Sequence, residues 1–194
     1  ALPILDNWCM TPRFLGIQKS GGYADHMIVP HPKYLVDVTG LDPQYAPILA
    51  CSGLTTYSAV RKLMPCSPQD WIVLMGAGGL GLLAVSMLRA LGHENIAVCD
   101  IDARKWDAAR AVGAKEVFDP SKPETQDQLM ALPGGVWGVA DFVGAALTAT
   151  LGMAVLRKGG RYVVVGLYSG EVPLSLVPMA QRALTIQGSY VGSL

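Results

Sequence analysis

The sequence is poor in charge, and its charges cancel. Only 15% of the 194 residues are Asp, Glu, Lys or Arg, with 15 basic residues against 15 acidic ones. An ordinary domain carries roughly 25%. Nucleic-acid binding needs a basic surface that a neutral, Lys- and Arg-poor chain lacks. We therefore expect no nucleic-acid partner.

Long apolar runs are also missing, although 51% of the residues are hydrophobic. The most apolar region, residues 71–91, is interrupted by glycines and by Arg89. No stretch reaches the ~18 uninterrupted apolar residues of a membrane-spanning helix, and residues 1–10 lack the basic start of a signal peptide. We expect no membrane partner. A high apolar content without a spanning segment favours a parallel α/β sheet that is covered on both faces.

Cysteine is scarce and widely spaced. The four residues Cys9, Cys51, Cys66 and Cys99 form no CxxC pair. This spacing argues against a disulfide framework and favours a reducing, cytoplasmic location. For Cys66 and Cys99 we expect the role of small buried hydrophobic side chains.

The first quarter of the chain has an irregular pattern. Residues 1–47 are proline-rich, with strands expected at 23–29 and 34–38. Residues 43–64 have a helical pattern in two pieces, broken near Ser52-Gly53. We divide the chain into a remnant at 1–47 and a larger domain at 48–194.

From residue 68 onward, apolar runs alternate with helical stretches. This alternation is typical of βαβ units and predicts a doubly wound parallel sheet, the Rossmann fold. The strands are expected at 71–75, 95–99, 116–118, 139–143, 161–165 and 184–191, and the helices at 80–91, 103–112, 125–132 and 148–156.

A glycine-rich turn joins the first of these strands to the first helix. Its pattern is Gly76-x-Gly78-x-x-Gly81, the dinucleotide-binding fingerprint when it lies between a strand and a helix. The first glycine permits the tight turn, the second lets the backbone approach the pyrophosphate, and the third lets the helix lie close to the strand. The start of the helix offers unpaired N–H groups to the phosphates.

An acidic residue stands where such a fold needs one. Asp100 follows the next strand, 19 residues beyond Gly81, and is placed to accept hydrogen bonds from the ribose hydroxyls. A carboxylate there repels a 2′-phosphate, so the sequence favours NAD over NADP. Arg104 and Lys105 follow closely and weaken that preference.

Several segments follow one another in an order and spacing that a known family shares. They lie at 21–30, 49–60, 76–81, 100–102, 141–144, 160–166 and 188–192. Together they resemble the medium-chain, zinc-dependent alcohol dehydrogenases over essentially the whole chain. The resemblance implies transfer of a hydride between an alcohol or carbonyl substrate and NAD. It also implies that residues 1–47 are a small irregular β remnant of a GroES-like catalytic domain, and we expect both ends of the chain to be cut.

The resemblance implies Zn²⁺ in the intact enzyme but supplies little of its site. Among the catalytic zinc ligands only Cys51 has a counterpart here, whereas a catalytic site takes three protein ligands. Cys9 resembles the last cysteine of a four-cysteine structural zinc lobe. Gly92-His93-Glu94 spells the family's zinc triplet at the wrong place, and we expect His93 to be a solvated turn residue. His26 and His31 flank an expected edge strand and should be structural or exposed.

Other roles follow from the resemblance. Thr55 matches a threonine that packs against the nicotinamide and is our candidate catalytic residue. The strand at 184–191 implies a homodimer or homotetramer paired through the last sheet strand. The candidate metal ligand is Cys51, and the candidate cofactor-binding residues are Thr55, Gly76, Gly78, Gly79, Leu80, Gly81, Asp100, Lys105, Val143, Gly144, Gly166 and Leu167.

Two other functions stay open at this point. A zinc-free quinone or enoyl reductase shares the fold, but Cys51 and Asp100 argue against it. A non-catalytic NAD-binding module is also compatible with the sequence. The leading interpretation is the cofactor-binding portion of an alcohol dehydrogenase that is catalytically incomplete by itself.

Overall fold

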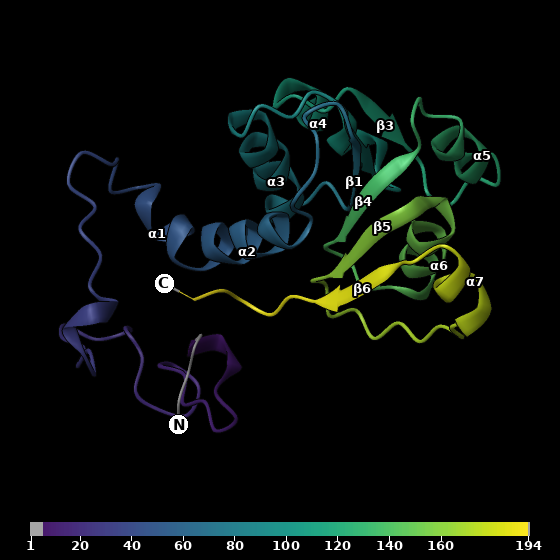
Figure 1. Ribbon diagram of the computed structural model, residues 1–194. Coiled ribbons are helices and arrows are strands. Elements are labelled where there is room, and N and C mark those ends of the chain that lie inside the picture. Colours follow the sequence, from purple (N-terminus) through teal and green to yellow (C-terminus); the bar gives the residue numbers. More distant parts are fainter. Residues whose placement is uncertain (1–5, 194) are drawn as a thin grey trace.

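Six buried segments pair side by side into one parallel sheet (Figure 1). The computed structural model describes residues 6–193. The strand order is β3-β2-β1-β4-β5-β6 and every neighbouring pair is parallel, which is the doubly wound order that the sequence predicts. The strands are β1 (Trp71–Met75), β2 (Ile96–Cys99), β3 (Glu116–Phe118), β4 (Val136–Asp141), β5 (Leu156–Val164) and β6 (Thr185–Gly188).

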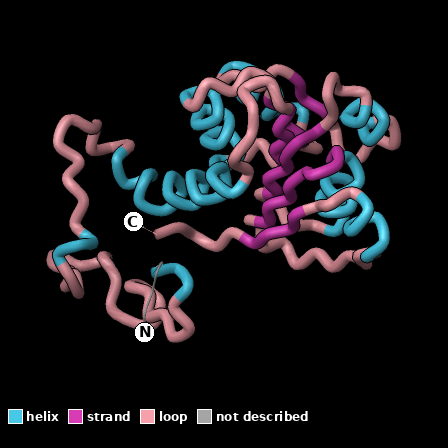
Figure 2. The backbone as a smooth tube through the Cα atoms, viewed as in Figure 1, coloured by secondary structure: helices cyan, strands magenta, loops and turns pink. Residues whose placement is uncertain are grey.

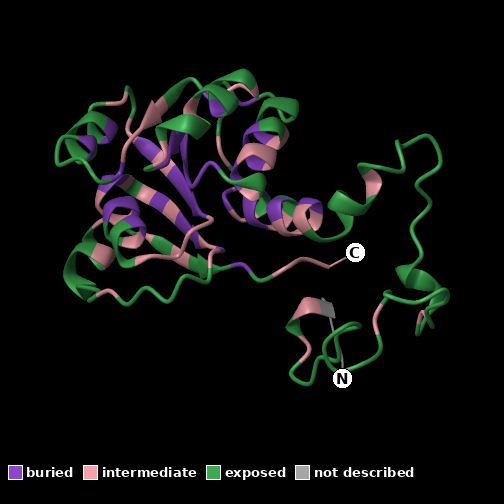
Figure 3. Ribbon diagram, turned by 180° about the vertical axis from the view of Figure 1, so that it is seen from behind, coloured by how far each residue is buried: buried purple, intermediate pink, exposed green. Residues whose placement is uncertain are grey.

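Helices cover both faces of the sheet (Figure 2). Along β1, Ile72 and Leu74 pack on one face with residues of α2, α3 and α4, while Val73 and Met75 pack on the other with residues of α5 and α6. Every residue of β1 is therefore buried (Figure 3), and this explains why its sequence is a continuous apolar run. The larger helices are α2 (Leu54–Lys62), α3 (Gly79–Ala90), α4 (Trp106–Ala111), α5 (Thr125–Met130), α6 (Ala146–Val155) and α7 (Leu176–Gln181).

Shorter helical turns complete the secondary structure. They are the 3₁₀ turns η1 (Asp6–Trp8), η2 (Pro32–Tyr34) and η4 (Ala103–Lys105), the short α1 (Ala46–Ile48) and the π-helical turn η3 (Leu49–Gly53). The expected helix at 103–112 is thus divided between η4 and α4. Between residues 6 and 193, no helix has the length and apolar character needed to cross a membrane.

The N-terminal part of the chain lies outside the sheet as an irregular segment (Figure 1). The strands expected at 23–29 and 34–38 are wrong, because the described residues 6–45 contain only one isolated bridge, between Leu15 and Lys19. A strand exists only through a ladder to a neighbour, and Pro30 and Pro32 lack the N–H groups that a ladder uses. The division at residue 47 stays a prediction.

Several other expected boundaries differ from the structure: β4 begins at Val136 and β5 at Leu156 rather than at 139 and 161, and α7 was not expected. The helix does not break near Ser52-Gly53. Instead η3 passes directly into α2, and Gly53 keeps right-handed helical angles of −61° and −51°. The last strand ends at Gly188 rather than at 191, since Ser189 N–H donates the last bond to Val164 and Val191 then turns away with φ +51°.

Candidate functional site

The turn after β1 brings the start of α3 against the sheet. Gly76 has φ +98° and its N–H donates to the Cys99 carbonyl at 2.7 Å. A Cβ on Gly81 would overlap the Gly76 carbonyl oxygen and lie 3.0 Å from its carbon. Only glycine therefore allows this approach of helix to turn.

Open space lies over the first turn of α3. A Cβ at Gly78 or Gly79 would meet no atom within 4 Å. Gly78 caps the helix with extended angles, and its carbonyl accepts from Leu82 N–H at 2.9 Å. The N–H groups of the first turn have no acceptor within the helix and point out of its end. Gly79, Leu80 and Gly81 belong to this turn, which is suited to an anionic group.

Asp100 lies at the end of β2, beside that turn. Its side chain is buried, Oδ2 accepts from Ala77 N–H at 2.7 Å, and Oδ1 accepts from Asp102 N–H at 2.8 Å. Lys105 Nζ donates to Oδ2 at 3.4 Å. Because a carboxylate has about four acceptor positions, Oδ1 retains room for one further donor. Asp100 thus fixes the glycine turn and remains able to accept a hydroxyl.

Basic side chains lie close to Asp100. The Lys105 side chain is about half exposed at 45%. Arg104 is engaged with Asp102, donating to its two carboxylate oxygens at 2.9 and 3.0 Å. These bonds lower the pKa of Asp102 to about 2. Lys105 is therefore the cation nearer to the candidate ribose position.

The turns after β4 and β5 interlock. Gly144 has φ +75°, and a Cβ there would overlap the Gly166 carbonyl oxygen. A Cβ on Gly166 would overlap Val143. Leu167, the next residue, is 80% exposed. The predicted residues of the two turns are thus side by side at the carboxyl edge of the sheet, on the same edge as the turn after β1, where open α/β sheets bind ligands.

A buried carboxylate holds the turn after β4, and sequence reasoning missed its role. Asp141 is fully buried, and its Oδ1 accepts from Val143 N–H at 2.8 Å and from Gly144 N–H at 2.9 Å. Oδ2 accepts from Thr148 Oγ1 at 2.8 Å and from Tyr162 Oη at 2.5 Å. Burial, and then the adjacent Asp141 charge, raise the pKa of the Tyr162 phenol, which stays a donor. The sequence did contain a signal for this role, because Asp141 is an acidic residue at the end of an apolar strand.

A cavity of about 310 Å³ lies beside these turns, at the ends of β5 and β6. Gly166 and Leu167 line it, together with Trp8 from η1 and Ser189 after β6. Lys62 also lines it and donates from Nζ to the Gly188 carbonyl at 3.1 Å. Burial lowers the pKa of Lys62. The cavity thus lies at the same edge of the sheet as the glycine turn.

The predicted zinc ligand and catalytic residue lie on the helical stretch before β1. Cys51 is exposed on η3, and Thr55 is half-buried in the first turn of α2. Across residues 6–193, no three side chains of His, Cys, Asp or Glu gather into a possible metal site. Since a catalytic zinc takes three protein ligands, the described residues do not fit that ion.

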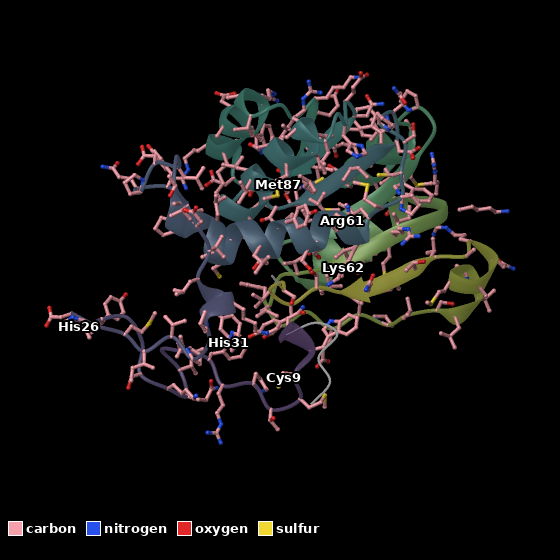
Figure 4. The ribbon with its side chains drawn as sticks, turned by 60° about the vertical axis from the view of Figure 1, so that its left-hand side comes forward. Cys9, His26, His31, Arg61, Lys62 and Met87 are labelled. Carbon is pink, nitrogen blue, oxygen red and sulfur yellow. The ribbon has the colours of Figure 1, made fainter. Side chains whose placement is uncertain are left out.

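Two histidines are exposed and one is not. His26 and His31 are exposed on the irregular N-terminal segment, away from the sheet (Figure 4). The expectation of a solvated His93 is wrong, because only 3% of this residue is exposed. Its Nε2 lies 3.7 Å from Cys66 Sγ. The loop before β1 folds over the turn, and Glu94 N–H donates to the Pro68 carbonyl at 3.0 Å. Cys66 is half-buried and Cys99 is buried.

Comparison with known proteins finds dehydrogenases among the relatives of this chain. The zinc-binding dehydrogenase family matches residues 79–194. An NAD-dependent alcohol dehydrogenase of Sulfurisphaera tokodaii is 33% identical over 191 residues, covering 97% of this chain and 55% of that protein. The chain spans about half the length of the curated relatives it matches.

Solved structures agree with the sequence relatives. The D-arabinose dehydrogenase of Sulfolobus solfataricus superposes with a TM-score of 0.89 at 26% identity, covering 97% of this chain and 59% of that one. A Sinorhizobium meliloti protein described as a zinc-binding dehydrogenase, solved with NADP, superposes with a TM-score of 0.85 at 26% identity. This match covers 97% of the present chain and 56% of the other.

Proposed function

The chain belongs to the zinc-binding dehydrogenase family, and we propose that it is the cofactor-binding portion of an NAD-dependent alcohol dehydrogenase. The observation that carries the proposal is the turn from Gly76 to Gly81, with open space at Gly78 above the first turn of α3. When bound, NAD would supply the carbon that accepts a hydride from an alcohol or returns it to a carbonyl.

Each part of the cofactor has a matching part of the site. The pyrophosphate fits the N–H groups at the start of α3, where no side chain intervenes. A ribose hydroxyl can donate to Asp100 Oδ1, which retains an acceptor position. The nicotinamide end is proposed to bind at the interlocked turns Val143-Gly144 and Gly166-Leu167 and in the cavity beside them. Thr55 is proposed to contact the nicotinamide face.

Asp100 supports NAD rather than NADP, because its carboxylate would face a 2′-phosphate across a hydrogen-bond distance. Lys105, 3.4 Å from that carboxylate, partly offsets this repulsion, and one solved relative was crystallised with NADP. We therefore propose a preference for NAD rather than exclusive use of it.

The test is an isothermal titration of the purified chain with NADH and with NADPH, in which binding is measured by calorimetry. We expect saturable binding, with NADH the tighter ligand. Asp100→Asn should weaken NADH binding by about tenfold, or about 1.4 kcal/mol, and narrow the difference between the two dinucleotides. Asp107→Asn is the matched control, because the Asp107 side chain is 99% exposed. A folded chain that binds neither dinucleotide would refute the proposal.

We propose that alcohol oxidation requires further zinc ligands, which the described residues do not supply. Cys51 alone cannot hold the family's catalytic zinc, since no further ligands gather near it in the described part of the chain. We expect no alcohol-dependent formation of NADH by these 194 residues, measured as absorbance at saturating NAD with added zinc. Turnover above the protein-free blank would contradict this expectation.

Several finer statements belong to the proposal as well. We propose a homodimer or homotetramer through β6, which pairs only with β5 among the described strands. A small alcohol or carbonyl substrate, a cytoplasmic location and the domain division at residue 47 are also proposed. The zinc-free reductase is not favoured, because the matched relatives are named NAD-dependent alcohol dehydrogenases.

A further inference from the structure

Three side chains that the proposed function does not use meet at the amino edge of the sheet. Met64 and Cys66 lie in the loop between α2 and β1, and His93 lies in the turn between α3 and β2. The glycine turn follows β1 at its other end, so the length of a five-residue strand, roughly 16 Å, separates the two places. This cluster is distinct from the candidate cofactor site.

The cluster is close-packed around one sulfur atom. Cys66 Sγ lies 3.3 Å from Met64 Sδ and 3.7 Å from His93 Nε2. Met64 and Cys66 are half-buried, whereas His93 is 97% covered. His93 Nδ1 is buried without a hydrogen-bond partner among the described residues. The imidazole is held by packing and by the nearby backbone of Ser67, with Nε2 3.7 Å from the thiol sulfur.

A thiol, a thioether and an imidazole are the ligands of soft metal ions. Thiolate and thioether sulfur select Cu(I), and imidazole is also a ligand of copper. In a trigonal site with bonds of about 2.2 Å, neighbouring donor atoms lie about 3.8 Å apart. The two distances from Cys66 Sγ, 3.3 Å to Met64 Sδ and 3.7 Å to His93 Nε2, approach this spacing. Rotation of the flexible Met64 side chain can bring its sulfur to the third position.

We propose that Met64, Cys66 and His93 form a binding site for one monovalent thiophilic cation of the Cu(I) class. On binding, the Cys66 S–H bond breaks, its proton passes to solvent, and a sulfur–metal bond forms without any change of oxidation state. One thiolate, one monovalent cation and two neutral ligands make a complex with no net charge, which suits a half-buried position.

The charged groups around the cluster are compatible with this complex. Asp70 pairs with Arg157 at 2.9 Å, and Asp70 and Arg161 act on the Cys66 thiol with opposite signs. Burial raises the pKa of that thiol to about 11, so the cation has to displace the proton. Burial lowers the pKa of His93, which keeps the imidazole neutral and able to bind metal.

The test measures withdrawal of Cu(I) from a coloured chelator complex under anaerobic, reducing conditions. The reference protein is the full chain with Cys9→Ser and Cys51→Ser, so that only Cys66 and Cys99 can bind copper as thiols. We expect it to withdraw one equivalent. X-ray absorption of that complex should show two sulfur ligands and one nitrogen ligand.

Matched variants separate this site from an ordinary thiol. Adding Cys66→Ser to the reference should abolish the equivalent, whereas adding Cys99→Ser should leave it intact. Met64→Leu preserves side-chain volume and should weaken binding at least tenfold, which keeps the test informative if the serine variant does not fold. The proposal is overturned by absence of uptake, by uptake that survives Cys66→Ser, or by a metal bound to Cys66 without Met64 and His93.

Discussion

Gly81→Ala should destabilise the protein although alanine is the better helix former. Gly81 lies in the first turn of α3, directly against the Gly76 carbonyl group. Its new Cβ would overlap the carbonyl oxygen and lie 3.0 Å from the carbonyl carbon, whereas carbon atoms in ordinary contact are about 3.5–4.0 Å apart. To clear the carbonyl oxygen, which is the closer of the two atoms, the helix would have to move away from the turn by more than about 1 Å.

The size of the effect follows from two opposing terms. Overpacking of this kind costs about 1–3 kcal/mol, and the upper end applies because the obstacle is backbone rather than a flexible side chain. Replacing glycine within a helix returns about 0.5–1 kcal/mol. The net loss for Gly81→Ala is therefore about 2 kcal/mol, or roughly 4–8 °C in Tm for a chain of this length.

Gly79→Ala is the matched control, two residues away in the same turn. A Cβ at Gly79 meets nothing within 4 Å, so this variant should keep or slightly raise the Tm. Both are measured by thermal and urea unfolding monitored by circular dichroism, without nucleotide. If the two variants unfold at the same temperature, the argument from close approach is refuted.

Three further predictions concern other residues. Gly78→Ala should cost no more than about 1 kcal/mol of stability as a helix cap. It should weaken NADH binding at least tenfold, because its methyl group would occupy the open space proposed for the pyrophosphate; equal affinity in calorimetry would contradict this. Tyr162→Phe removes a bond to the buried Asp141 and should cost about 1.5–3 kcal/mol in urea unfolding, whereas Tyr168→Phe, at a 76% exposed residue, should cost nothing. Burial lowers the pKa of His93 below its ordinary 6.5, so the unfolded chain takes up a proton more readily and stability should fall as the pH drops below 6.5. Urea unfolding at pH 7.5 and 5.5 measures how much unfolding free energy is lost on acidification. This loss should be smaller in His93→Gln than in the natural sequence, and an equal loss would count against a lowered His93 pKa in the folded chain.

Structural features that depend on residues close together in the sequence were predictable. β1 is buried on both faces, and its five residues are all apolar, so the strand is visible without knowledge of its neighbours. The same holds for the glycine turn, where Gly76 takes a positive φ and Gly81 allows the close approach of the helix to the turn. Residues 23–29 also have the composition expected of a strand, but they have no ladder partner among the described residues and form no strand. A strand needs a hydrogen-bonding partner from elsewhere in the chain, and a local sequence pattern does not show whether that partner exists.

His93 shows the same limit for burial. A histidine between Gly92 and Glu94 in a helix-to-strand turn has every local sign of a solvated residue. It is covered because the loop carrying Cys66 and Pro68, about 25 residues earlier, folds over it. Burial of His93 therefore depends on a contact between two loops that are distant in the sequence. The composition of either loop alone does not predict that contact.

Asp141 links the core to the candidate site, and this link changes how substitutions there should be interpreted. One carboxylate oxygen binds the N–H groups of Val143 and Gly144, while the other accepts from Tyr162 on β5 and from Thr148 on α6. Because the carboxylate is rigidly shared, a change at Tyr162 alters the support of a turn that it does not contact. A loss of cofactor affinity in Tyr162→Phe would therefore report the position of the turn rather than a contact with the cofactor, and it should accompany the loss of stability. The geometry of the candidate site therefore depends on a hydrogen-bond network inside the core, and a motif of glycines alone does not specify it.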